Sequence, residues 1–117
     1  MKVEVRFLGM DPSPEVKEYA ARRVAIALGR RAAEIDEVLV RMGDVNGPKG
    51  GFDKRCQVML RGRQVQVTVD ALAPEATTAI DLAVAKADRG LSAELGRART
   101  NRRARGRWFQ LLLDDAG

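Results

Sequence analysis

Two kinds of apolar periodicity divide this chain and limit what it can fold into. Four short segments place apolar residues at every second position, which predicts strands with one buried face. Two longer segments place them every three or four positions, which predicts amphipathic helices. The predicted strands cover residues 2–8, 35–42, 54–60 and 64–70, and the predicted helices cover residues 14–29 and 74–96.

The apolar faces of these segments predict the core and the fold class. The economical arrangement is an α+β fold in the order β-α-β-β-β-α, with a four-stranded sheet and both helices packed on one of its faces. Ser13 is predicted to cap the first helix, Pro14 to open it and Gly29 to terminate it. The core-facing strand residues are predicted to be Val3, Val5, Phe7, Val38, Val40, Met42, Cys56, Val58, Leu60, Val65, Val67 and Val69. The apolar stripes of the helices are Val16, Ala20, Val24 and Leu28, and then Ala76, Ile80, Val84, Ala87, Leu91 and Leu95.

The length of 117 residues suits one domain. We assign residues 1–97 to this domain and residues 98–117 to a basic tail with a short apolar end. The N-terminus lacks the continuous apolar core of a signal peptide, and no apolar run approaches the length of a membrane span. A single cysteine forms no internal disulfide. These features favour a cytoplasmic protein.

The residues that catalysis or metal binding would need are nearly missing. The chain has no histidine, and its one cysteine, Cys56, is in phase with Val58 and Leu60. This phase favours a small buried hydrophobe over a catalytic thiol. Asp81 and Asp88 lie two helical turns apart and are predicted to pair with nearby bases rather than to form an acid/base dyad. We therefore expect no enzyme activity, no metal, no cofactor and no small-molecule substrate.

The glycine-rich stretch "NGPKGG" raises the separate question of a phosphate-binding loop. No Gly-Lys-Ser/Thr sequence follows, and the segment leads into a predicted strand rather than a helix. The stretch is therefore interpreted as a loop between strands. Gly90 lies inside the second predicted helix, where glycine costs about 1 kcal/mol relative to alanine, and is consistent with close packing against a neighbour.

Basic residues carry the clearest functional signal. The net charge is +5 and the pI is about 10, which favours polyanionic partners. The excess charge is concentrated near the C-terminal end, where "GRARTNRRARGRW" (residues 96–108) contains six arginines and no acidic residue. Three interpretations of such a segment are open: a solvated end without a role, a membrane-surface anchor or a nucleic-acid-binding segment. Arginine outnumbers lysine by 16 to 5 in the chain, and its planar fork matches phosphate oxygens, which favours nucleic acid.

The basic residues of the predicted helices form ordered sets. At about 100° per residue, Lys86, Arg89 and Arg97 fall within about 80° of one another and about 120° or more from the middle of the apolar stripe. They form a solvent-facing basic ridge that continues into the arginine-rich segment. Arg23 and Arg30 nearly superimpose on the first helix, and Arg22 and Arg31 flank them. Two helices on one face of the sheet would bring both sets onto one surface.

Three stretches resemble a known family: "SPEVKEYAARRV", "VRMGDVNGPKGGFDKRCQVMLRG" and "TTAIDLAVAKADRGL". They are similar to the ribosome hibernation-promoting factor family, also called ribosome-associated inhibitor A or sigma-54 modulation protein. The resemblance covers roughly residues 1–97, and its most specific pieces are "GGFDKRC" and "AID" followed by "KADRGL". It implies a fold similar to a double-stranded RNA-binding domain. It also implies the short type of the family, because long members carry a second C-terminal domain.

The resemblance implies a partner and a set of contact residues. The partner would be the small ribosomal subunit with its 16S-type rRNA, bound in the channel that holds mRNA and tRNA, so that translation is blocked in stressed or resting cells. The family's basic helical positions correspond to Lys17, Arg23, Lys86, Arg89 and Arg97. With the residues found from the charge pattern, the predicted ribosome-contact residues are Lys17, Arg23, Arg30, Lys86, Arg89, Arg97, Arg99, Arg102 and Arg103.

Two other functions stay open at the level of sequence. One is a general double-stranded RNA-binding module, and the other is a protein-interaction adaptor that uses the exposed sheet face or the apolar end. The end, "WFQLLLDD", either folds Trp108 and Leu111 to Leu113 back onto an apolar groove or contacts a ribosomal protein or a second copy of the chain. Self-association is left open by the sequence.

Overall fold

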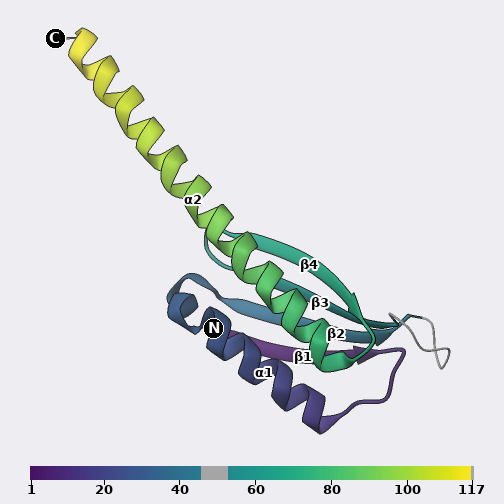
Figure 1. Cartoon of the computed structure of the whole chain (residues 1–117). Helices are drawn as coiled ribbons and strands as arrows, with labels where there is room; N and C mark the ends of the chain where they lie inside the picture. Colours follow the sequence, from purple (N-terminus) through teal and green to yellow (C-terminus); the bar gives the residue numbers. More distant parts are fainter. Residues whose placement is uncertain (46–52, 117) are drawn as a thin grey trace.

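A computed structural model confirms the predicted fold class. It describes residues 1–45 and 53–116, with side chains for residues 1–45 and 53–97. One mixed sheet has the strand order β1-β2-β3-β4, in which β1 and β2 are parallel and the other neighbours antiparallel. Both helices cover the same face of this sheet (Figure 1). The elements are β1 (Lys2–Leu8), α1 (Pro14–Leu28), the 3₁₀ helix η1 (Gly29–Glu34), β2 (Glu37–Asp44), β3 (Lys54–Arg61), β4 (Gln66–Ala73) and α2 (Ala76–Ala116).

The core lies between the sheet and the two helices. The predicted inward residues of β2 and β3 are fully buried, whereas those of β1 are only partly buried because β1 is an edge strand. Full burial of one such aliphatic side chain contributes roughly 1.5–3 kcal/mol, so these alternating faces hold the two layers together. The helices contribute Ala20, Val24, Leu28, Ala79, Ile80, Ala83, Val84, Ala87 and Leu91 to the same cluster.

The ends of α1 follow local signals. Ser13 is the N-cap, and its hydroxyl oxygen accepts a hydrogen bond from the Val16 N–H at 3.3 Å, while Pro14 begins the helix. The helix ends at Leu28, one residue before the predicted terminator. Gly29 keeps a right-handed φ of −59°, so it does not act as a left-handed cap, and the chain tightens into η1 instead.

The C-terminal boundary of the second helix differs from the prediction. The predicted end near residue 96 is wrong, because α2 continues without a break to Ala116 and projects past the sheet (Figure 1). The continuation is rich in Arg, Ala and Leu and contains no proline, so nothing in its local propensity stops the helix. The division into residues 1–97 and 98–117 stays a prediction.

Gly90 lets α2 approach β4 closely. A Cβ atom built on Gly90 would lie 2.8 Å from Cγ1 of Val67, closer than side chains tolerate. The glycine therefore lowers the intrinsic stability of the helix but permits close packing of helix on sheet.

We expect Gly90→Ala to lower the free energy of unfolding by about 1 kcal/mol. Overpacking costs about 1–3 kcal/mol, and the better helix propensity of alanine returns about 1 kcal/mol. In a Val67→Ala background the added methyl group meets only the Cβ atom of residue 67, at an ordinary contact distance of 3.9 Å, so there the same change should stabilise. Urea unfolding of the unchanged protein, the two single variants and the double variant measures both effects. A stabilising Gly90→Ala in the otherwise unchanged protein would contradict the close-packing argument.

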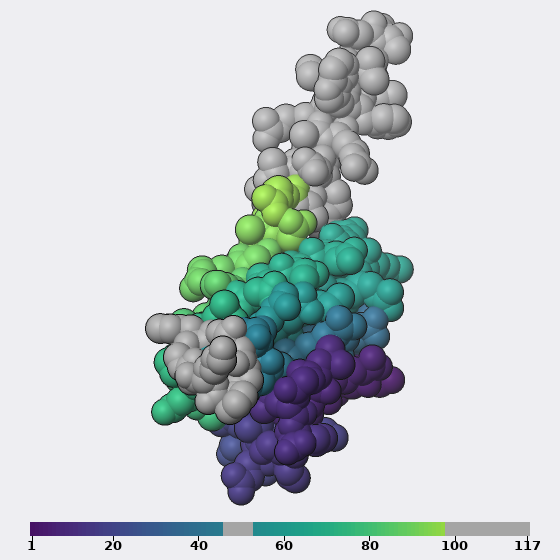
Figure 2. Space-filling view, turned by 90° about the vertical axis from the view of Figure 1, so that its right-hand side faces the viewer, coloured from purple at the N-terminus to yellow at the C-terminus, as the bar shows by residue number. Residues whose placement is uncertain are grey.

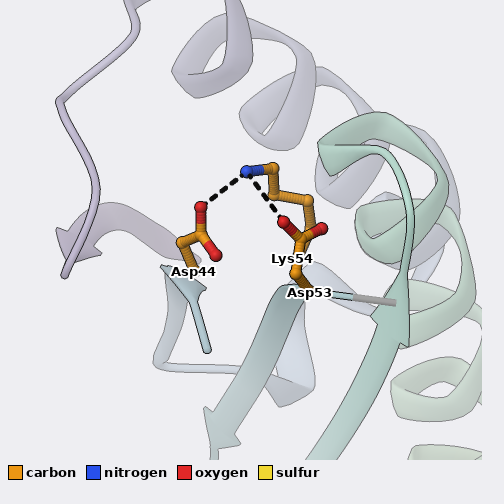
Figure 3. A network of polar contacts seen from close by, with 3 residues as sticks. All are labelled: Asp44, Asp53 and Lys54. Carbon is orange, nitrogen blue, oxygen red and sulfur yellow. Dashed lines mark hydrogen bonds and ion pairs between the residues drawn. The ribbon is translucent and has the colours of Figure 1, made fainter. Parts of the chain in front are cut away.

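A polar network joins the ends of β2 and β3 (Figure 3). The Lys54 ammonium donates a hydrogen bond to Oδ2 of Asp44 at 2.8 Å and lies 3.7 Å from Oδ2 of Asp53. The hydrogen bond to Asp44 raises the pKa of Lys54. Asp53 is the one charged residue buried in the described part of the chain, at 5% exposure, and the neighbouring cation compensates its carboxylate. The backbone bond from Val45 N–H to the Asp53 carbonyl, 2.8 Å, closes the same strand ends.

Candidate nucleic-acid interface

The two basic helices lie side by side and run in the same direction. Tyr19 of α1 contacts Asp81 of α2, and Arg31 of η1 contacts Asp88 of α2. The later residue of the α1–η1 segment thus meets the later residue of α2, as expected for parallel helices. Figure 2 shows the molecule turned by 90° about the vertical axis. The purple N-terminal segments lie at the bottom, and the light green part of α2 rises above the sheet.

The candidate interface consists of the solvent-exposed sides of α1, η1 and α2.

Three of the predicted contact residues carry a cationic group that makes no ion pair or side-chain hydrogen bond with the described part of the chain. Lys17 lies in the first turn of α1, Arg30 lies in η1 and Arg89 lies on α2. All three are exposed, and none has an ion pair or a side-chain hydrogen bond within residues 1–45 and 53–97. Each is thus able to reach an external phosphate without first leaving a partner.

The other two members of the predicted ridge are exposed but engaged. The Lys86 ammonium donates a hydrogen bond to the backbone carbonyl of Asp70 on the edge strand β4, at 2.8 Å. Arg97 pairs with Glu94 three residues before it. Exposed contacts of this kind contribute little to stability, so a phosphate can replace them at small cost.

A line of polar contacts joins α1 and η1 to α2, and we call it the interhelical seam. Its residues are Tyr19, Arg23 and Arg31 on one side and Asp81, Asp88 and Ser92 on the other. The Tyr19 hydroxyl donates to Oδ1 of Asp81 at 2.7 Å, and this hydrogen bond raises the pKa of Tyr19. The two aspartates thus pair with nearby basic residues, as predicted: Asp81 with Arg23 of α1 and Asp88 with Arg31 of η1.

Arg23, the other predicted contact residue of α1, is partly exposed, with 38% of its side chain accessible, and is engaged with α2. Its Nε atom is 3.1 Å from Oδ1 of Asp81, at ion-pair distance but without the alignment of a hydrogen bond. Its neighbour Arg22 is exposed and makes no ion pair or side-chain hydrogen bond with the described side chains. Periodicity places Arg23 close to the apolar stripe of the helix. This position was the one signal in the sequence that Arg23 is less exposed than Arg22.

The remaining predicted contacts lie outside the described side chains. These are Arg99, Arg102 and Arg103, and the same holds for Trp108 and Leu111 to Leu113. The backbone of this part belongs to α2. The "NGPKGG" loop also lies outside the described residues.

The chemistry of the described residues gives no sign of a reaction centre. Burial raises the pKa of the Cys56 thiol to about 12, so the reactive thiolate is negligible at neutral pH. Residues 1–45 and 53–97 contain no group of three side chains able to hold a metal ion. Within the part that the structure describes, no helix is both long and apolar enough to cross a bilayer.

A family model described as "Sigma 54 modulation protein / S30EA ribosomal protein" matches residues 3–99. The chain belongs to this family. The match confirms the resemblance found from the sequence motifs and makes the chain a ribosome-associated factor rather than an enzyme. No curated protein matches the chain by sequence.

Two solved structures share the fold of this S30EA family member. A ribosomal subunit interface protein from Coxiella burnetii has a TM-score of 0.67 and 17% identity, over 82% of this chain and 99% of that one. The N-terminal domain of Protein Y from Thermus thermophilus has a TM-score of 0.62 and 14% identity, over 76% of this chain and 93% of that one. At such low identity the likeness establishes the fold alone.

Proposed function

We propose that this chain binds in the mRNA/tRNA channel of the small ribosomal subunit and blocks translation by occupying it. The observation that carries the proposal is the arrangement of α1 and α2 side by side on one face of the sheet (Figure 1), together with the exposed and unengaged cations Lys17, Arg30 and Arg89 on these helical segments. Membership of a ribosome-associated family supports the partner. The setting would be the cytoplasm of stressed or resting cells, where silent ribosomes are stored.

Binding would depend on backbone phosphates and on shape. Aromatic residues make up only 4% of the chain, too few for the stacking platforms of single-strand readers. Lys86 and Arg97 would exchange their internal contacts for phosphate oxygens. Arg99, Arg102 and Arg103 follow on the same helix, and we propose that they extend the contact along rRNA.

Co-sedimentation with purified ribosomes on sucrose gradients tests this function. The chain should remain on the small subunit in the presence of excess free duplex RNA, and its affinity should fall steeply as salt rises, because phosphate neutralisation releases counterions. Complete loss to the duplex competitor would favour a general RNA-binding module and overturn the proposal.

The uncovered face of the sheet favours a second candidate, a protein-interaction adaptor. A groove of about 310 Å³ lies on this face, and its lining includes the apolar side chains of Leu39 and Met59 together with the Arg61–Glu37 ion pair. Protein interfaces combine apolar and polar groups in this way. Absence of ribosome binding at both low and moderate salt would place this candidate first.

A further inference from the structure

The helices α1 and η1 follow each other directly, and we call them together the first helical segment. This segment contains two pairs of adjacent arginines, Arg22–Arg23 and Arg30–Arg31. In each pair the first arginine is exposed and makes no ion pair or side-chain hydrogen bond with the described side chains. The second arginine of each pair faces an aspartate of α2. The same chemical group therefore occurs four times, twice engaged and twice unengaged, at neighbouring positions.

Asp81 holds the first engaged arginine. Its Oδ1 atom accepts the Tyr19 hydroxyl at 2.7 Å and lies 3.1 Å from Nε of Arg23. The Arg23 side chain retains 38% exposure, so water reaches it but its charge already has a counter-ion. A phosphate brought to Arg23 would also approach the Asp81 carboxylate, and the like charges would oppose it.

Asp88 and Ser92 hold the second engaged arginine. Nη1 of Arg31 donates to the Ser92 hydroxyl oxygen at 2.6 Å and lies 3.9 Å from Oδ1 of Asp88. The Arg31 side chain is 29% exposed, the lower of the two values. Asp81, Asp88 and Ser92 are spaced by seven and four residues, so they lie on one side of α2 and face the first helical segment together.

We infer that Asp81 and Asp88 act as an acidic clamp, which neutralises Arg23 and Arg31, fixes α1 against α2 and leaves Arg22 and Arg30 as the phosphate-contact arginines of the first helical segment. This inference rests on the proposed ribosome binding. It replaces Arg23, expected from the sequence, by Arg22 as the contact residue. The clamp residues position the surface and do not touch the RNA.

Matched glutamine variants of the four arginines test the clamp on small ribosomal subunits. Each phosphate contact contributes about one to the slope of log affinity against log salt concentration. Arg22→Gln and Arg30→Gln should each lower that slope by about one. Because Arg23→Gln and Arg31→Gln leave a bare aspartate, they are measured as the charge-balanced pairs Arg23→Gln/Asp81→Asn and Arg31→Gln/Asp88→Asn, which should keep the slope of the unchanged protein.

Asp81→Asn alone should change the salt dependence of binding in the opposite direction. It should unmask Arg23, steepen the slope by about one and raise the affinity at low salt. Equal loss of slope in Arg22→Gln and in the charge-balanced Arg23→Gln/Asp81→Asn variant would overturn the clamp while leaving ribosome binding intact.

Tyr19 reports on the clamp without any ribosome, because it is the only tyrosine in the chain. The hydrogen bond to Asp81, burial and the Asp81 charge raise its pKa, whereas Arg23 and Arg22 oppose this rise. Asp81→Asn should therefore lower the pKa read from the ultraviolet absorbance of tyrosinate, and Asp88→Asn, further along α2, should leave it unchanged. An unchanged titration in Asp81→Asn would overturn the clamp, and failure of the unchanged protein to bind ribosomes would overturn only the proposed function.

Discussion

Reversing the charge of Lys86 and Arg89 together is expected to lower the affinity for the small ribosomal subunit by about a hundredfold, or about 2.7 kcal/mol. Two phosphate contacts are lost, and two carboxylates are placed against the RNA backbone. Both residues are exposed on α2, and the only described contact removed is the exposed bond from Lys86 to the Asp70 carbonyl. Folding should therefore be preserved. Co-sedimentation across a salt series measures the loss, and circular dichroism checks the fold.

The control for this variant carries the same change of net charge on the opposite face. Lys2 and Arg41 belong to β1 and β2, and their side chains lie on the face of the sheet that the helices do not cover. Lys2→Glu/Arg41→Glu should leave ribosome binding within a few-fold of the unchanged protein. Equal losses in both variants would show that overall charge, rather than the α2 surface, controls binding.

Gly62→Ala is expected to lower the free energy of unfolding by roughly 3 kcal/mol or more. Gly62 lies in the turn between β3 and β4, where its N–H donates to the Val65 carbonyl at 2.9 Å. A Cβ atom at this position would lie 1.9 Å from the backbone carbonyl oxygen of Glu34. No rotamer change relieves a clash with backbone, so η1 or the turn has to move. Urea unfolding monitored by circular dichroism measures the change.

Gly29→Ala is the matched control for Gly62→Ala. Gly29 has an ordinary right-handed φ of −59°, and nothing lies within 4 Å of an added Cβ atom. Alanine restricts the unfolded chain there without strain in the folded one, so the change should be neutral or stabilise by about 0.4–1 kcal/mol. A similar loss of stability in both variants would show that the contact with Glu34 is not the cause.

The faces of the strands could be predicted well because their periodicity is local. Cys56, Val58 and Leu60 alternate with polar neighbours, and all three are buried as predicted. A shift of one residue would have turned all of them to the other face, so the pattern leaves one choice. The end of α2 had no such local signal: the helix was predicted to end near residue 96, whereas it continues to Ala116.

The candidate surface was predicted in part. Composition and helical phase identified the basic residues of α2, and Lys86, Arg89 and Arg97 are exposed as expected. The phase placed Arg23 close to the apolar stripe, but it could not show the ion pair of Arg23 with Asp81, which lies 58 positions further along the chain.

The sequence by itself determined the order of strands and helices, their buried faces, the basic charge that favours a polyanionic partner and, through its motifs, the family. Each of these depends on neighbours within a few turns of helix or on composition. The tertiary structure decided the close approach of Gly90 to Val67, the interhelical seam and which of the adjacent arginines pair with aspartates of α2. These depend on which side chains of distant segments meet, and local periodicity does not contain that information.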